Sequence, residues 1–111
     1  MSAIYKWDFP VVKRETRERV MKAVCIEFDI SEEELRSKRA FRHLVDARTV
    51  YAWLCREYLS DTYMRIGKEL GGRTHSAVIS LVNRMEDFIY VKDNLTHRLK
   101  LIEHKILTQS I

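Results

Sequence analysis

DTYMRIGKELGGRTHSAVISLVNRMEDF, residues 61–88, has the pattern of two helices joined by a tight turn. The pair Asp61-Thr62 suits a helix N-cap, and Ile66 and Leu70 lie on one face of a short helix. Gly71-Gly72 stops this helix and tolerates the backbone angles of a close turn. A second helix is expected from about Thr74, and its apolar face consists of Val78, Leu81, Val82, Met85 and either Phe88 or Ile89. These parts together predict a helix-turn-helix.

Helical periodicity continues on both sides of this stretch. It predicts a helix from Thr16, a short helix after Ser31, a long helix before Asp61 and a last helix after Asp93-Asn94. Ser31 and Glu34 have the spacing of a capping box, so the short helix should end near residues 35–37. The apolar positions spaced by three and four residues are Val20, Ala23, Val24, Phe28, Leu44, Ala47, Val50, Tyr51, Leu54, Tyr58, Leu95, Leu99, Ile102 and Ile106. No stretch alternates as a half-buried strand does, and the predicted fold class is all-α.

The length and composition fit one globular domain. The chain has 111 residues, of which 46% are hydrophobic and 32% are charged, and a chain of this length supports one core. We expect residues 14–111 to form a single helical domain and residues 1–13 to form an N-terminal extension. Trp7 and Phe9 make this extension either a segment packed on the domain or part of an interaction segment. Charges interrupt every apolar run well short of about 18 residues, so we expect a cytoplasmic protein without membrane contact.

The residues that usually carry catalysis or bind metals are not arranged for either. Cys25 and Cys55 are far apart, belong to no CxxC pair and are typical of buried thiols in a reducing compartment. The four His residues lack zinc-ligand spacing. His75 and Ser76 are neighbours on a helix, so their side chains diverge by about 100° and cannot act together as base and nucleophile. No GxxxxGK[ST] loop is present for a nucleotide. We therefore expect no enzyme activity, metal, cofactor or nucleotide.

Positive charge is concentrated around the predicted helix-turn-helix. Residues 36–84 contain ten Lys or Arg and four acidic residues, a charge of +6, whereas the rest of the chain carries −2. Arg73-Thr74-His75-Ser76 gives the second helix a first turn that is rich in hydrogen-bond donors. This turn meets base edges in helix-turn-helix proteins, and basic residues neutralise phosphates. The pattern predicts a protein that binds double-stranded DNA.

Four short motifs resemble the C-terminal DNA-binding domain of the bacterial replication initiator DnaA. They are Ser37-Lys-Arg39, Ala47-Arg48, Ile66-Gly67 and Gly71-Gly-Arg-Thr-His-Ser-Ala-Val78, against the family patterns SKRR, AR, IG and GGRDHSTV. The resemblance covers roughly residues 15–90. It implies a Trp-repressor-like helical bundle in which a basic loop reaches the minor groove and the GGRDHS helix enters the major groove.

The resemblance also implies roles for individual residues. After the turn Gly71-Gly72, the DNA-binding residues of the major-groove helix would be Arg73, Thr74, His75, Ser76 and Ala77, with Thr74, His75 and Ser76 facing base edges. The residues near the phosphate backbone would be Ala77, Arg48, Arg56 and Arg84, and the basic loop would be formed by Lys38, Arg39 and Arg42.

Two positions depart from the family pattern. Ala40 replaces the second arginine of SKRR, and Thr74 replaces the aspartate of GGRDHS, whose carboxylate can accept a hydrogen bond from cytosine N4. These changes favour an altered DNA target. The biological role stays open among replication initiation, its regulation, and a phage or mobile-element process at the nucleoid.

The alternative function is a protein–protein adaptor that keeps the fold without specific DNA binding. Its docking surface would come from Trp7, Phe9 and the helix that contains Leu99 and Ile102. The charge of +6 argues against this alternative, because a fold kept only for packing does not need concentrated positive charge.

Overall fold

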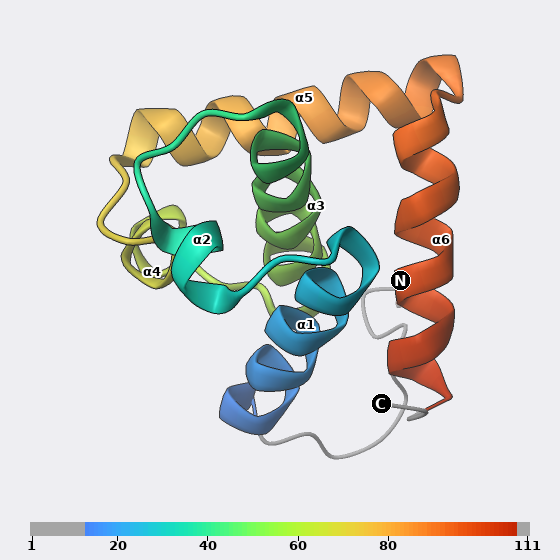
Figure 1. The fold of residues 1–111 in the computed structure, drawn as a ribbon, viewed down its shortest axis with the longest axis horizontal. Helices are drawn as coiled ribbons and strands as arrows, with labels where there is room; N and C mark the ends of the chain where they lie inside the picture. Colours follow the sequence, from blue (N-terminus) through green and yellow to red (C-terminus); the bar gives the residue numbers. More distant parts are fainter. Residues whose placement is uncertain (1–12, 109–111) are drawn as a thin grey trace.

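Six helices make up the fold in a computed structural model that describes residues 13–108 (Figure 1). Within this range the structure contains no strand, which confirms the all-α prediction. The expected domain covers the described residues, whereas Trp7 and Phe9 lie outside them. The helices are α1 (Lys13–Phe28), α2 (Glu32–Arg36), α3 (Arg42–Leu59), α4 (Tyr63–Glu69), α5 (His75–Val91) and α6 (Asn94–Leu107).

Side-chain caps fix where most of these helices begin. Ser31 and Glu34 form the complete capping box at α2, and Ser37 ends that helix as predicted. Thr62 caps α4 and Thr74 caps α5, each by accepting a backbone N–H three residues later. The Asp93 carboxylate accepts the Leu95 N–H at the start of α6. The predicted boundaries around the helix-turn-helix are therefore confirmed.

The α3 helix stands in the middle of the molecule, with α1, α5 and α2–α4 around it (Figure 1). Six consecutive residues, 50–55, are buried, so α3 is covered on all sides. Among the aromatic residues of this region, Tyr51 and Trp53 are buried, and Tyr58 and Tyr63 are half-buried against the core. This central position lets α3 hold both the helix-turn-helix and the loop that precedes α3.

The α6 helix lies along the side of the bundle and packs on α1 and α5 (Figure 1). Leu99 and Ile102 are buried there, whereas Leu101 between them is 42% exposed. Leu99 and Ile102 are therefore no part of the docking surface expected on this helix, because the helical period turns both into the core; the docking surface itself stays a prediction.

A buried ion pair joins α1 to the segment between α3 and α4. The Arg17 guanidinium donates to both Asp61 carboxylate oxygens, at 2.9 and 2.7 Å. These hydrogen bonds raise the pKa of Arg17 above its ordinary value. Sequence reasoning placed Asp61 in an N-cap, but Thr62 caps the helix and Asp61 instead anchors it to α1.

The two thiols, Cys25 and Cys55, are both buried and unbonded to each other, as the sequence predicted. Burial raises the pKa of Cys25 to about 11, so this group stays a neutral thiol near pH 7. Among the described helices, none is long and apolar enough to cross a membrane.

Candidate nucleic-acid interface

The turn between α4 and α5 depends on close backbone packing. The Gly67 carbonyl accepts the N–H groups of both Gly72 and Arg73, each at 2.9 Å. A Cβ on Gly67 would lie 2.2 Å from the Arg73 carbonyl oxygen. Gly71 has a φ of +85°, and a Cβ there would lie 2.2 Å from the Arg36 carbonyl oxygen. The two glycines therefore permit α4 to approach both the start of α5 and the end of α2.

The first turn of α5 presents its side chains to solvent. Thr74, His75 and Ser76 are exposed and Ala77 is half-buried. The Thr74 hydroxyl accepts the Ala77 N–H at 3.1 Å, and its own O–H remains able to donate to another acceptor. The His75 ring lies 5.2 Å from the Tyr63 ring, between centroids. This turn can offer hydroxyl and imidazole groups to base edges.

Arg56 supports this turn from α3. Its guanidinium carbon lies 4.3 Å from the centroid of the Tyr63 ring, and Nη1 donates to the Asp61 carbonyl at 2.9 Å. Arg56 is exposed, so its charge also remains accessible to a phosphate.

The segment between α2 and α3, residues 37–41, is tied to the helix-turn-helix through one carbonyl. Ser37 O accepts a hydrogen bond from Arg73 Nη2 at 2.7 Å and another from Arg48 Nη2 at 2.8 Å. Arg73 also donates to the Leu70 carbonyl at the end of α4. The loop and the turn of the helix-turn-helix thus share a fixed junction.

The Arg48 side chain lies inside this loop instead of on the surface. It is 3% exposed and, besides Ser37 O, donates to the carbonyls of Leu35, Arg39 and Glu34, at 2.8, 2.7 and 3.2 Å. Burial, together with the like charge of Arg73, lowers the pKa of Arg48 to about 10, so the guanidinium is still charged near pH 7. The structure therefore gives Arg48 a role in holding the loop, whereas the sequence-based expectation was a phosphate contact.

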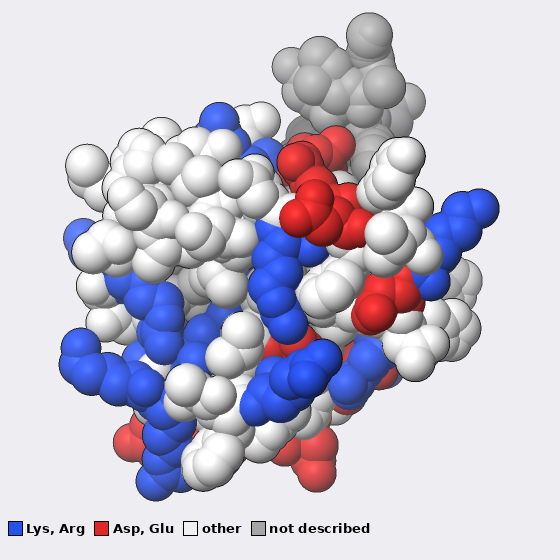
Figure 2. Space-filling view, turned by 90° about the horizontal axis from the view of Figure 1, so that it is seen from above, with Lys and Arg blue, Asp and Glu red and all other residues white. Residues whose placement is uncertain are grey.

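The cations of the loop, and Arg42 at the start of α3, point outward. Lys38 and Arg39 are exposed, and the Arg42 side chain is 85% exposed. In Figure 2, Lys and Arg side chains gather over the left and lower part of the view, on the side where Figure 1 places the beginning of α5. Exposed basic side chains therefore lie on the loop and on the side of the molecule where α5 begins.

Arg84 joins the middle of α5 to the start of α3. It donates to the Thr49 hydroxyl at 2.7 Å and to the Asp46 carboxylate at 2.9 Å, and it lies over the Phe88 ring. Its side chain is 28% exposed. Arg84 is thus engaged within the protein, although part of the group still reaches the surface.

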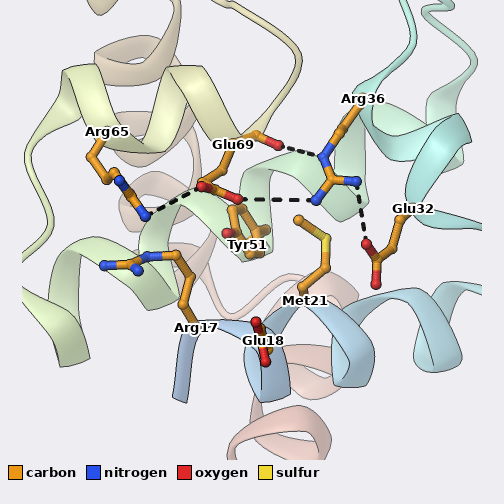
Figure 3. A pocket seen from close by; sticks show the side chains of 8 residues that line it. All are labelled: Arg17, Glu18, Met21, Glu32, Arg36, Tyr51, Arg65 and Glu69. Atoms are coloured by element: carbon orange, nitrogen blue, oxygen red, sulfur yellow. Dashed lines mark hydrogen bonds and ion pairs between the residues drawn. The ribbon is translucent and has the colours of Figure 1, made fainter. Parts of the chain in front are cut away.

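A pocket of about 250 Å³ lies between α1, α2 and α4 (Figure 3). Ion pairs and hydrogen bonds connect the charged side chains on its wall. Arg36 binds Glu32 Oε1 at 3.2 Å and the Glu69 carbonyl at 2.9 Å, and Arg65 lies 3.5 Å from Glu69. The arrangement holds the end of α4 against α2, just before the glycine turn.

Within residues 13–108, no group of three or more His, Cys, Asp or Glu side chains is placed to bind a metal ion. What the structure brings together is a basic loop, an exposed helix start and the side chains that fix them. Sequence reasoning missed the long-range contacts of Arg36 and Asp61, whose partners lie 33 and 44 residues away. The spacing of four residues in Glu32–Arg36 and in Arg65–Glu69 was the local signal for this network.

Residues 17–85 match the protein family described as bacterial DnaA protein helix-turn-helix. A chromosomal replication initiator protein DnaA from Streptococcus agalactiae serotype Ia is 31% identical to the chain over 101 residues, which are 91% of this chain and 22% of that protein. The DnaA protein of Streptococcus mutans serotype c is 32% identical over 89 residues, 80% of this chain and 20% of its own length. The chain thus spans about a fifth of the length of these curated relatives.

Proposed function

Because this chain belongs to the bacterial DnaA helix-turn-helix family, we propose that it binds double-stranded DNA and distinguishes between sequences. The observation that carries the proposal is the junction at Ser37 O, where Arg48 and Arg73 hold a basic loop beside the exposed start of α5. A surface of this kind combines phosphate neutralisation with base readout, which are the two requirements of specific DNA binding.

In the proposed complex, the first turn of α5 enters the major groove. His75 and Ser76 donate to acceptors on base edges, and Thr74 either donates its O–H or contacts a thymine methyl. Lys38, Arg39, Arg42 and Arg56 neutralise phosphates on either side. Arg48 and Arg73 keep the loop and the turn in place, and no step requires a cofactor.

The proposed biological setting is replication initiation or its regulation, or a phage or mobile-element process that uses similar sites. The relatives that match are named chromosomal replication initiator proteins, which supports this setting. Thr74 and Ala40 replace residues that contact bases in the family pattern, so we propose that the preferred sequence differs from the usual DnaA box.

Fluorescence anisotropy tests the proposal directly. The chain is titrated onto a DnaA-box duplex, a scrambled duplex and a random-sequence duplex pool, at about 50 and 200 mM salt. Binding that weakens steeply with salt, together with enrichment of one sequence from the pool, supports a specific reader. If no duplex is bound even at low salt, the DNA-binding proposal is wrong and the adaptor alternative gains support.

The substitution His75→Ala tests the assignment of the reading turn. We expect it to weaken binding to the preferred duplex by about 1–3 kcal/mol and to change binding to the scrambled duplex little, because a base contact is lost and phosphate contacts remain. The matched control is His97→Ala, an exposed histidine on α6. Equal losses on both duplexes would contradict the placement of α5 in the major groove.

A further inference from the structure

Phe41 lies at a position where its side chain contributes little to the stability of the fold. It is the N-cap residue of α3, and its side chain makes no capping hydrogen bond. Serine, threonine, aspartate and asparagine stabilise this position, whereas a phenyl ring has no acceptor for the free N–H groups. The ring is also 60% exposed, so it contributes little to the core. Its stacking partner is the exposed His43, at 6.1 Å between centroids.

The residues next to Phe41 in the sequence are basic or uncharged, and the nearest acidic residue along the chain is Asp46, 4.0 Å from Arg42. Residues 37–45 include Lys38, Arg39 and Arg42 and no acidic residue. An apolar ring surrounded by cations matches nucleic acid, in which an anionic backbone borders stacked bases.

The spacing between the first turns of α3 and the start of α5 suits two neighbouring grooves. Arg84 binds Asp46 and Thr49, so the first turns of α3, just after Phe41, pack beside the middle of α5. From His75 to Arg84 the helix rises roughly 14 Å. Major and minor grooves alternate every half turn of the duplex, about 17 Å along its axis. When the first turn of α5 lies in the major groove, the loop therefore reaches the adjacent minor groove.

We propose that Phe41 is an aromatic wedge that enters the minor groove and partly unstacks one base step. The inference rests on the proposed DNA binding and adds to it a residue that selects deformable sites. Apolar side chains act in this way in other minor-groove proteins, where flexible pyrimidine–purine steps are the easiest to open. Lys38, Arg39 and Arg42 neutralise the phosphates that flank the opened step.

The substitution Phe41→Ser separates this role from a structural one. The duplex is the one that the wild-type chain enriches most strongly from the random-sequence pool. We expect affinity for it to fall about tenfold, while the melting temperature rises by a few degrees because serine caps α3. Phe41→Leu keeps an apolar wedge and most of the affinity. The control Tyr90→Ala removes a ring that is 88% exposed near the end of α5 and leaves affinity unchanged.

A base analogue identifies the groove. Replacing adenine by 2,6-diaminopurine adds an amino group to the minor groove and keeps the major-groove pattern of adenine. At the step under the loop, this replacement should weaken the wild-type chain and leave Phe41→Ser unaffected. Unchanged affinity of Phe41→Ser, or equal sensitivity of both chains to the analogue, overturns the wedge while DNA binding stands. Failure of the wild-type chain to bind any duplex overturns both proposals.

Discussion

At the scale of single residues, Arg48 holds the backbone of the basic loop in one conformation. Its guanidinium donates to four carbonyls between Glu34 and Arg39. We expect Arg48→Ala to lower the free energy of unfolding by about 3 kcal/mol, because these buried acceptors lose a charged donor. Arg48→Lys should recover less than half of that loss, since an ammonium group cannot reproduce the planar fork. Urea denaturation measures both effects.

Arg19→Ala, which removes an exposed arginine of α1, serves as the control for Arg48 and should change the unfolding free energy by less than about 0.5 kcal/mol. If Arg48 is instead a phosphate contact, Arg48→Ala will leave stability intact and flatten the salt dependence of DNA binding. Stability and the salt dependence of DNA binding, measured together for Arg48→Ala, therefore distinguish a residue that holds the loop from a residue that contacts phosphate.

At the scale of elements, the helix-turn-helix depends on how closely α4 approaches the start of α5. Gly67 lies inside α4, where alanine ordinarily stabilises a helix by about 1 kcal/mol. Here a Cβ would lie 2.2 Å from the Arg73 carbonyl oxygen. We expect Gly67→Ala to destabilise the fold by more than about 2 kcal/mol and to weaken DNA binding. Ser80→Ala, on the exposed face of α5, should be neutral or slightly stabilising in the same thermal unfolding measurement.

The elements themselves could be predicted from the sequence because their signals are local. Ser31, Thr62 and Thr74 lie within three residues of the groups they cap, and the apolar residues repeat within one turn. The site could be predicted only in outline. Arg48 and Arg73 count as positive charge in the sequence, but long-range packing turns both toward backbone carbonyls. Likewise, no local pattern shows that the ring of Phe41 remains exposed.

At the scale of the whole molecule, the pair Arg17–Asp61 holds α1 against the helix-turn-helix. Their side chains are 11% and 5% exposed, so Asp61→Ala leaves a buried charge without its partner. We expect a loss of about 3–5 kcal/mol in the free energy of unfolding, measured by urea denaturation. The double variant Arg17→Met/Asp61→Leu should recover most of this loss, because no charge remains buried. A double variant as unstable as Asp61→Ala would show that the loss comes from packing.

In the proposed complex, the shared carbonyl of Ser37 would make binding sensitive to the twist of the DNA. Since Arg48 and Arg73 hold that one oxygen, the loop cannot turn around the duplex independently of α5. One base pair inserted between the two proposed contacts rotates one relative to the other by about 34°, and the protein has no hinge there to follow it. Such a site would lose one contact completely, and overwinding or underwinding of the DNA would change affinity without any change of base.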